Sequence, residues 1–220
     1  MRLRPRPIRA TIVGVEPVLM TERLVLRRFT AADVDGLLAL DGDPAVMRFL
    51  DSQIKSRAEI EAEVLPRFLG YYQRYRDFGF WAADTRDEGG FIGWFCLRPV
   101  APAAAAIVHW ADADGDTSVV GLGYRLRPDA WGRGYATEGA RALVRRAFAE
   151  LGVTEVVATT MAVNTGSRAV LAKAGLRHAR TVHLTWPEPL PGNEDGDVEY
   201  RLRRQDWLES TAGTQPAPAG

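Results

Sequence analysis

Residues 122–152, LGYRLRPDAWGRGYATEGARALVRRAFAELG, decide how this chain can fold. They begin with an alternating run typical of a strand, pass through a turn with Pro128 and two glycines, and then become helical in pattern. The apolar residues of the helical part recur at spacings of three and four and form one stripe: Ala136, Ala140, Leu143, Val144, Ala147, Phe148 and Leu151. Gly152 follows the stripe, as is common at helix C-termini. The stretch predicts a strand, a glycine-containing loop and a helix.

The predicted loop is suited to bind a phosphate. The first N–H groups of a helix have no partner within the helix, and the helix dipole is positive there. Gly132 and Gly134 lack the Cβ that would keep a ligand away from the backbone, and Arg133 between them adds a positive charge. A glycine turn that only lets the helix begin explains the two glycines equally well.

Two nucleotide-binding patterns fit this loop poorly. The Walker pattern fails because no Gly-Lys-Ser or Gly-Lys-Thr follows the glycines. The dinucleotide fingerprint matches at Gly132 and Gly134, but Thr137 stands where its third small residue belongs. Glu155 lies about where a ribose-binding acid would be sought. An NAD-dependent enzyme is therefore a weak alternative.

The composition is that of an ordinary soluble protein. The chain has 220 residues, of which 46% are hydrophobic and 25% charged, enough for a sizeable core. Basic and acidic residues number 28 each, so no field of one sign would attract nucleic acid or an anionic membrane. No apolar run approaches the roughly 20 residues that span a bilayer, and the N-terminal apolar run is too short for a secretory signal. We expect a cytoplasmic protein that binds neither nucleic acid nor membrane.

The sequence contains no clear metal site or reactive thiol. The three histidines have no ligand spacing. Asp112, Asp114 and Asp116 alternate as in a calcium loop, but no glutamate stands in the closing position, which favours a plain turn. Cys96, the single cysteine, sits in an apolar run and is expected in the core.

The remaining patterns indicate one α+β domain with two extensions. Residues 1–17 are expected to form an N-terminal extension, residues 18–208 the domain, and residues 209–220 a disordered tail. Strands are expected over residues 21–29, 78–83, 91–98, 107–110, 118–126, 154–161 and 198–202. Helices are expected after capping residues Thr30 and Ser56, after Asp43, after the central loop, and after Asn164, with Pro66 interrupting the second long one. Because strands alternate with helices only in the second half, we expect a mixed sheet.

The loop also resembles a known cofactor site. Residues 131–136, WGRGYA, resemble the acetyl-CoA pyrophosphate loop of the GNAT acetyltransferases, in which Gln or Arg is followed by two residues, Gly, one residue, and Gly or Ala. Gly134 and Ala136 match, whereas Trp131 departs from the first position and is similar to the RimJ/RimL-type branch, which contains the ribosomal-protein alanine N-acetyltransferases. Further similarity runs in the same order from about Thr21 to Trp207, including TERLVLRRFTAAD and the closing EYRL.

This resemblance implies a GNAT fold with α/β/α layers. The fold has a central mixed, mostly antiparallel sheet of about six to seven strands with a splayed pair at the acetyl-CoA site. The residues expected to bind this cosubstrate are Leu126, Trp131, Gly132, Arg133, Gly134, Tyr135, Ala136, Thr137, Asn164, Ser167 and Lys173. The backbone near Leu126 would pair with the pantetheine arm, and the amides of residues 133–137 would take the pyrophosphate.

The resemblance also implies two catalytic residues. Asn164 would contact the pantetheine, and Ser167 lies where a hydroxyl could protonate the departing thiolate. A helix cap and an ordinary first-turn serine explain these residues as well. Gly121 stands where many family members carry a glutamate base, and Leu171 where others carry a tyrosine acid. Residues that remain candidate bases are Glu138, Glu188, Glu199 and His183.

The missing base bears on the acceptor. An α-amine with a pKa near 7.7 to 8.0 is neutral in about a tenth of molecules at pH 7, whereas a lysine amine near 10.4 is neutral in well under about a thousandth. We therefore expect an N-acetyltransferase that uses acetyl-CoA and no metal, and acetylates a protein N-terminus or a small-molecule amine by direct attack. The alternatives are a non-catalytic CoA-binding sensor and an aminoglycoside-type antibiotic acetyltransferase. The protein is expected to be a monomer or homodimer.

The acceptor pocket is expected to involve residues 43–80 and 184–197. The second segment is acidic, which would suit a cationic amine, although a solvated loop is the more common explanation for such charge. Its acidic residues are Glu188, Glu194, Asp195 and Asp197.

Overall fold

One mixed sheet forms the scaffold of the molecule. In the computed structural model, which describes residues 16–50, 54–87, 89–100 and 116–212, eight strands pair in the order β1-β2-β3-β4-β5-β6-β8-β7. This is slightly more than the six to seven strands expected. The strands are β1 (Pro17–Met20), β2 (Leu24–Arg27), β3 (Gly79–Thr85), β4 (Phe91–Pro99), β5 (Val119–Leu126), β6 (Glu155–Met161), β7 (Arg177–Val182) and β8 (Asp197–Arg203).

The sheet is antiparallel except at its centre. Strands β1 to β5 pair antiparallel in sequence order, and β6, β8 and β7 form a second antiparallel group. Strands β5 and β6 join the two groups as a parallel pair. A parallel pair needs a crossover connection, which here contains helix α5 (Tyr135–Glu150). The mixed, mostly antiparallel sheet is therefore confirmed.

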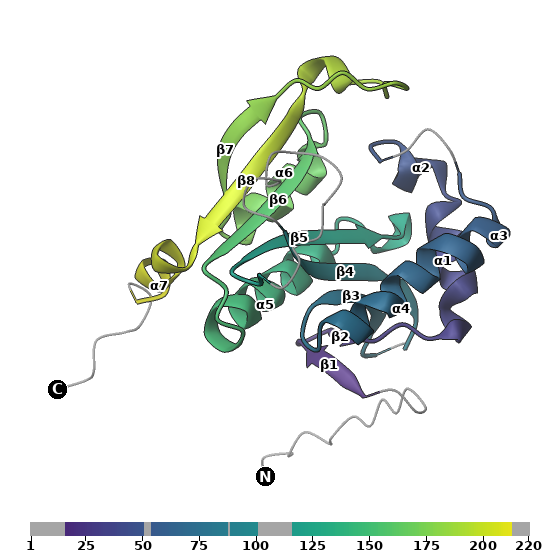
Figure 1. Cartoon of the computed structure of the whole chain (residues 1–220), viewed down its shortest axis with the longest axis horizontal. Coiled ribbons are helices and arrows are strands. Elements are labelled where there is room, and N and C mark those ends of the chain that lie inside the picture. Colours follow the sequence, from purple (N-terminus) through teal and green to yellow (C-terminus); the bar gives the residue numbers. More distant parts are fainter. Residues whose placement is uncertain (1–15, 51–53, 88, 101–115, 213–220) are drawn as a thin grey trace, which may run out of the picture.

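Helices cover both faces of this sheet (Figure 1). Trp81 of β3 packs into a core with α5 and α6 (Thr165–Lys173). Its neighbour Phe80 packs on the other face with α1 (Val34–Asp41) and α4 (Leu65–Arg74). Successive strand residues point to opposite faces, so the two cores flank the sheet and give the expected α/β/α layers. The short helices α2 (Pro44–Met47) and α3 (Arg57–Glu59) accompany α1 and α4, and α7 (Arg204–Ala212) follows β8.

Helix α5 lies unusually close to the sheet at Gly139. A Cβ on this residue would stand 2.3 Å from Cζ of Phe95, whose side chain on β4 is fully buried. Real Cβ atoms do not approach a ring so closely, so any other residue would push the helix or the ring away. Gly139 thus sets the height of α5 above the strands that it covers.

Local sequence signals place most helix starts correctly. Thr30 with Asp33 and Ser56 with Glu59 form the two expected capping boxes. Pro66 has no N–H to donate to the turn before it, and the chain widens into a π turn over Ile60–Val64 before α4 resumes. The expected interruption therefore occurs one turn earlier than the proline.

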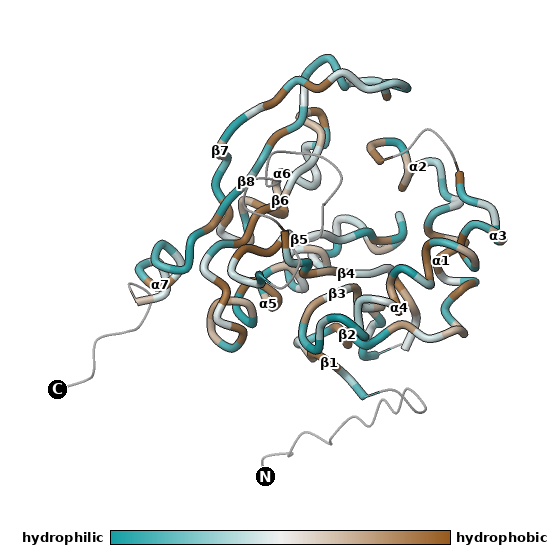
Figure 2. The backbone as a smooth tube through the Cα atoms, in the orientation of Figure 1, coloured by the Kyte–Doolittle hydropathy of each residue, from teal (hydrophilic) through white to brown (hydrophobic). Residues whose placement is uncertain are grey.

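The sequence patterns missed β1, β7 and α7. Strand β7 is a largely exposed edge strand, and Figure 2 shows it as predominantly hydrophilic, so it has no apolar alternation to detect. Strand β1 begins at Pro17, within the expected extension 1–17, and α7 reaches Ala212, within the expected tail 209–220. The expected strand at residues 107–110 and the acidic turn with Asp112 and Asp114 lie outside the described residues.

The expectations about membrane spans, metal sites and Cys96 can be compared with the described part of the chain. None of its helices is both long enough and apolar enough to span a bilayer. Its side chains form no group of three or more metal-ligating residues. Cys96 is buried in the core, as expected.

Gly139→Ala should destabilise the fold, because the added methyl group clashes with Phe95. We expect the free energy of unfolding to fall by about 1–3 kcal/mol. The matched control is Gly70→Ala in α4, where a Cβ meets no atom within 4 Å and alanine should add about 0.5–1 kcal/mol of stability. Urea unfolding measures both, and equal stabilities of the two variants would contradict the close approach.

Candidate functional site

Strands β5 and β6 separate soon after they meet. Their pairing covers only Val119–Gly121 and Glu155–Val157, although each strand continues for several residues. The N–H of Arg127 donates to the carbonyl of Ile92 on β4 at 2.9 Å. Because an antiparallel ladder alternates, the main-chain groups of Leu122, Tyr124 and Leu126 then point away from β4 and into the gap. An extended ligand could pair with this open strand edge.

The loop after β5 is fastened to the end of that strand. Nε1 of Trp131 donates to the carbonyl oxygen of Leu126 at 2.7 Å, while the indole stays 40% exposed. Trp131, which departs from the family pattern, therefore has a structural role, because its hydrogen bond holds the loop against the end of β5. It also occupies the Leu126 carbonyl, which leaves the N–H of Leu126 and the main chain of Tyr124 to face the gap.

The start of α5 is open to an anion. Gly132 and Gly134 have φ angles of 70° and 83°, in the left-handed region that favours glycine. Gly134 is the N-cap, and no side chain caps the helix. The first amides of α5 thus keep their donors for a ligand at the positive end of a 16-residue helix.

An ion pair braces this helix start from the side. Arg23 of the β1–β2 turn donates to the carbonyl oxygen of Arg133 at 2.9 Å and pairs with Glu138 at 2.6 Å. Thr21 donates a further hydrogen bond to Glu138 at 2.6 Å. Burial would raise the pKa of Glu138, but the hydrogen bonds from Thr21 and Arg23 and the charge of Arg23 outweigh it and lower the pKa. Glu138 is therefore an anchoring residue and a poor base.

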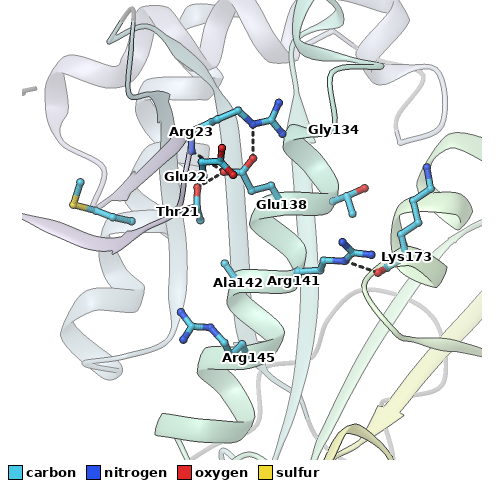
Figure 3. Close-up of a pocket in the computed structure, with 11 residues that line it drawn as sticks. Thr21, Glu22, Arg23, Gly134, Glu138, Arg141, Ala142, Arg145 and Lys173 are labelled. Carbon is cyan, nitrogen blue, oxygen red and sulfur yellow. Dashed lines mark hydrogen bonds and ion pairs between the residues drawn. The ribbon is translucent and has the colours of Figure 1, made fainter. Parts of the chain in front are cut away.

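A groove of about 540 Å³ runs along α5 from its first turn. Figure 3 shows Arg141 and Lys173 on one flank of the helix and Arg23 on the other. Nε of Arg141 donates to the main-chain oxygen of Lys173 at 2.7 Å, which joins α5 to α6. The lining residues are Met20, Thr21, Glu22, Arg23, Gly134, Thr137, Glu138, Arg141, Ala142, Arg145 and Lys173. Four are cations and two are acids, one of which Arg23 neutralises.

Three polar residues meet beside the gap. Oδ1 of Asn164 accepts from the N–H of Ser167 at 3.1 Å, so Asn164 caps α6. The hydroxyls of Ser167 and Tyr124 lie 3.0 Å apart, and the Tyr124 hydroxyl lies 3.1 Å from the Ser167 carbonyl oxygen. Burial raises the pKa of Tyr124 to about 12, although the hydrogen bond with Ser167 lowers it somewhat. Both hydroxyls keep their protons at neutral pH.

Tyr124 was not among the site residues expected from the sequence. Its partner Ser167 lies 43 positions later, so no local pattern links them. The available signal was its place in the β5 alternation, on the same face as Leu122 and Leu126.

Of the other candidate bases, one is already paired and two are exposed. Glu199 is fully buried and pairs with Arg180 at 2.9 Å and with Arg201. Glu188 and His183 are exposed on the segment between β7 and β8.

The residues described above fit acetyl-CoA in kind and order: an open strand edge, an anion site at a helix start, and a cationic groove beyond it. Residues 23–177 match the model of the acetyltransferase (GNAT) domain. The chain belongs to the GNAT acetyltransferase family. It is an acetyl-CoA-dependent N-acetyltransferase, and the NAD-dependent alternative is wrong.

Relatives of known name support the same family and differ in acceptor. The chain is 35% identical over 196 residues to the FsC-acetyl coenzyme A-N(2)-transacetylase of Aspergillus fumigatus, covering 89% of this chain and 80% of that protein. The fold is similar to the ribosomal L7/L12 alpha-N-protein acetyltransferase RimL in complex with coenzyme A, with a TM-score of 0.66, 18% identity and coverage of 87% and 99%. An aminoglycoside acetyltransferase in complex with coenzyme A has a TM-score of 0.62 at 21% identity, with coverage of 86% and 99%.

Gly132→Asp should weaken binding of acetyl-CoA, because it adds a carboxylate beside the uncapped start of α5, where the pyrophosphate is expected to bind. We expect the dissociation constant to rise at least about tenfold, or about 1.4 kcal/mol. Gly152→Asp, just after the C-terminal end of α5, is the matched control. The φ angle is 71° at Gly152 and 70° at Gly132, and a Cβ would meet no atom within 4 Å at either residue. Both substitutions carry the same backbone strain. Titration calorimetry at fixed salt compares them, and undiminished binding by Gly132→Asp would refute this placement.

Proposed function

We propose that this enzyme acetylates a primary amine of low pKa on a small molecule, by direct attack of the amine on the thioester in a ternary complex. The observation that carries the proposal is the 35% identity, over most of the chain, to an enzyme named for acetylating a nitrogen of an acceptor called FsC. The absence of a proton-transfer side chain at Gly121 and Leu171 favours an acceptor that is easily deprotonated.

A protein N-terminus is the second candidate acceptor. The likeness to RimL favours it, but at 18% identity that likeness concerns the fold. The aminoglycoside acetyltransferase has nearly the same likeness, so these neighbours do not separate the two acceptor classes. Thiol release from acetyl-CoA, measured with small amines and with N-terminal peptides, tests the proposal. Turnover with peptides alone would contradict it.

The cofactor residues divide into three groups along the site. The amides of residues 133–137 hold the pyrophosphate, with Arg133 adding charge. The main chain of β5 from Leu122 to Leu126 pairs with the pantetheine arm, with Asn164 beside it. Lys173 at the far side of the groove faces the nucleotide end of the cofactor, where its positive charge suits a phosphate.

Lys173→Met should weaken acetyl-CoA about two- to fivefold, the effect of losing an exposed ion contact of roughly 0.2–1 kcal/mol. Acetyl-3′-dephospho-CoA should be unaffected by the change, because it lacks the phosphate that the lysine meets. Lys55→Met before α3 is the control and should alter neither ligand. If Lys173→Met lowers the affinity for both cofactors equally, Lys173 does not contact the 3′-phosphate.

Ser167 supplies a proton to the departing sulfur, and Tyr124 holds the serine hydroxyl in place. As the carbon–sulfur bond breaks, the hydroxyl proton of Ser167 passes to the thiolate. The proton that the new amide nitrogen loses restores the hydroxyl pair. The support is the 3.0 Å contact between the two hydroxyls at the edge of the gap, and the raised pKa that keeps Tyr124 a donor.

Ser167→Ala should lower kcat by about 10- to 100-fold with little change in acetyl-CoA affinity, because the acid acts in the transition state. Tyr124→Phe should lower kcat less, and the double variant should be no slower than Ser167→Ala alone. Tyr200→Phe is the control, since it removes a buried phenol that contacts Arg168 at 3.3 Å. Steady-state kinetics measure kcat for each variant. If the losses in kcat add in the double variant, the two hydroxyls act independently and Tyr124 does not work through Ser167.

A further inference from the structure

Five acidic side chains are buried in the described part of the chain, and four of them have arginine partners. Arg27 pairs with Asp33 at 2.7 Å and with Asp84 at 2.6 Å, Arg125 pairs with Asp41, and Arg180 and Arg201 pair with Glu199. The fifth is Asp197, which has no ion pair within the described residues. The fold therefore neutralises its buried carboxylates with one exception.

Asp197 is also incompletely hydrogen-bonded. Its side chain is 8% exposed, and Oδ2 is buried without any hydrogen-bond partner. Trp186 hydrogen-bonds the carboxyl group and lowers its pKa, but the larger effect of burial raises that pKa above the usual range. A buried carboxylate with an oxygen left unpaired costs free energy, which a cationic ligand would recover.

Asp197 lies on the face of the sheet away from the cofactor helices, and strand β6 stands between it and the gap. It is the first residue of β8, opposite Met161 at the end of β6 and Val182 at the end of β7. Its neighbour Val198 packs in the core beneath α5 and α6. Because strand residues alternate, Asp197 points to the opposite face, the one that carries α1 and α4. Cofactor phosphates held at α5 leave this face to the acceptor.

We propose that Asp197 is a catalytic residue that binds the ammonium group of the acceptor and takes a proton from it. This deepens the proposed function and rests on it. The freed amine attacks the thioester carbonyl carbon, so a carbon–nitrogen bond forms and the carbon–sulfur bond breaks. The nitrogen loses its second proton, which ends on the thiolate, and Asp197 releases the first to water. The acceptor class is a small molecule that presents a protonated primary amine.

Other charged groups surround Asp197. The His183 ring lies beside Gly196, where a Cβ would stand 3.1 Å from its Nδ1. Glu199 lies two residues further along the same face and is neutralised by its arginines. Glu194 and Asp195 are exposed on the preceding turn. None of these forms an ion pair with Asp197, so a pH profile must be compared with a variant that lacks only this carboxylate.

Asp197→Asn keeps the shape of the side chain and removes its charge. With acetyl-CoA and α-amine probes such as glycinamide and alaninamide, we expect kcat/KM for the amine to fall about 100-fold or more, while acetyl-CoA affinity is unchanged. The parent rate should decline at acidic pH as the carboxyl group protonates, and the variant should lose that step. Glu150→Gln, which removes an exposed carboxylate at the end of α5, is the control and should behave like the parent. Equal kcat/KM for Asp197→Asn and the parent would overturn the proposal.

Thermal unfolding without ligands gives a second test that needs no acceptor. A carboxyl group whose pKa is raised by folding destabilises the folded state as pH rises above its unfolded value near 3.9, and does not below it. Asp197→Asn should therefore match the parent in Tm near pH 4 and exceed it by pH 8. A lower Tm at every pH would make Asp197 a structural residue and overturn the proposal.

The two proposals can fail separately. If the parent turns over acetyl-CoA with N-terminal peptides and with no small amine, the proposed function is wrong. If the parent is active and Asp197→Asn retains both its kcat/KM and its pH profile, the function stands and the role of Asp197 is wrong.

Discussion

The separation of β5 from β6 is the constraint on which the site depends. Parallel pairing stops at Gly121 and Val157, yet β4 continues to hold β5 in an extended form as far as Leu126. The main-chain groups on the free edge of β5 therefore face a gap that no strand fills. Buried main-chain groups without partners are costly, so such an edge persists where a ligand or water completes it. Because α5 begins directly after this edge, one continuous path joins strand donors to helix donors.

Positive charge along that path is controlled by pairing. The charge of Arg23 is neutralised by its ion pair with Glu138. The same guanidinium group donates a hydrogen bond to the carbonyl oxygen of Arg133 in the loop. Among the described residues, neither Arg141 nor Lys173, which line the same groove, forms an ion pair with a carboxylate. The site thus presents its free charge where an anionic nucleotide end would lie, and keeps the helix start rigid and uncapped.

The parts of this architecture that the sequence predicted are those with local causes. The strand, loop and helix of residues 122–152 and the capping boxes at Thr30 and Ser56 depend on neighbours within a few positions, and the structure confirms them. Strand β7 was not predicted from the sequence, because an exposed edge strand needs no apolar alternation. The contact between Tyr124 and Ser167 was not predicted, because the two residues lie 43 positions apart and meet only in the folded chain. Asp197 was named as part of the acidic segment 184–197, but its burial could not be predicted, because an acidic loop and a buried carboxylate look alike in a sequence.

The two glycines of β5 leave this part of the strand without a side chain that could accept a proton. Gly121 and Gly123 alternate with Val120 and Leu122, which point into the core beneath α5, so the glycines lie on the opposite face of the sheet. Gly121 is buried and Gly123 is half-buried, and neither has a side chain that could accept a proton. In the part of the chain that the structure describes, one buried carboxylate on that side has no arginine partner, at the start of β8.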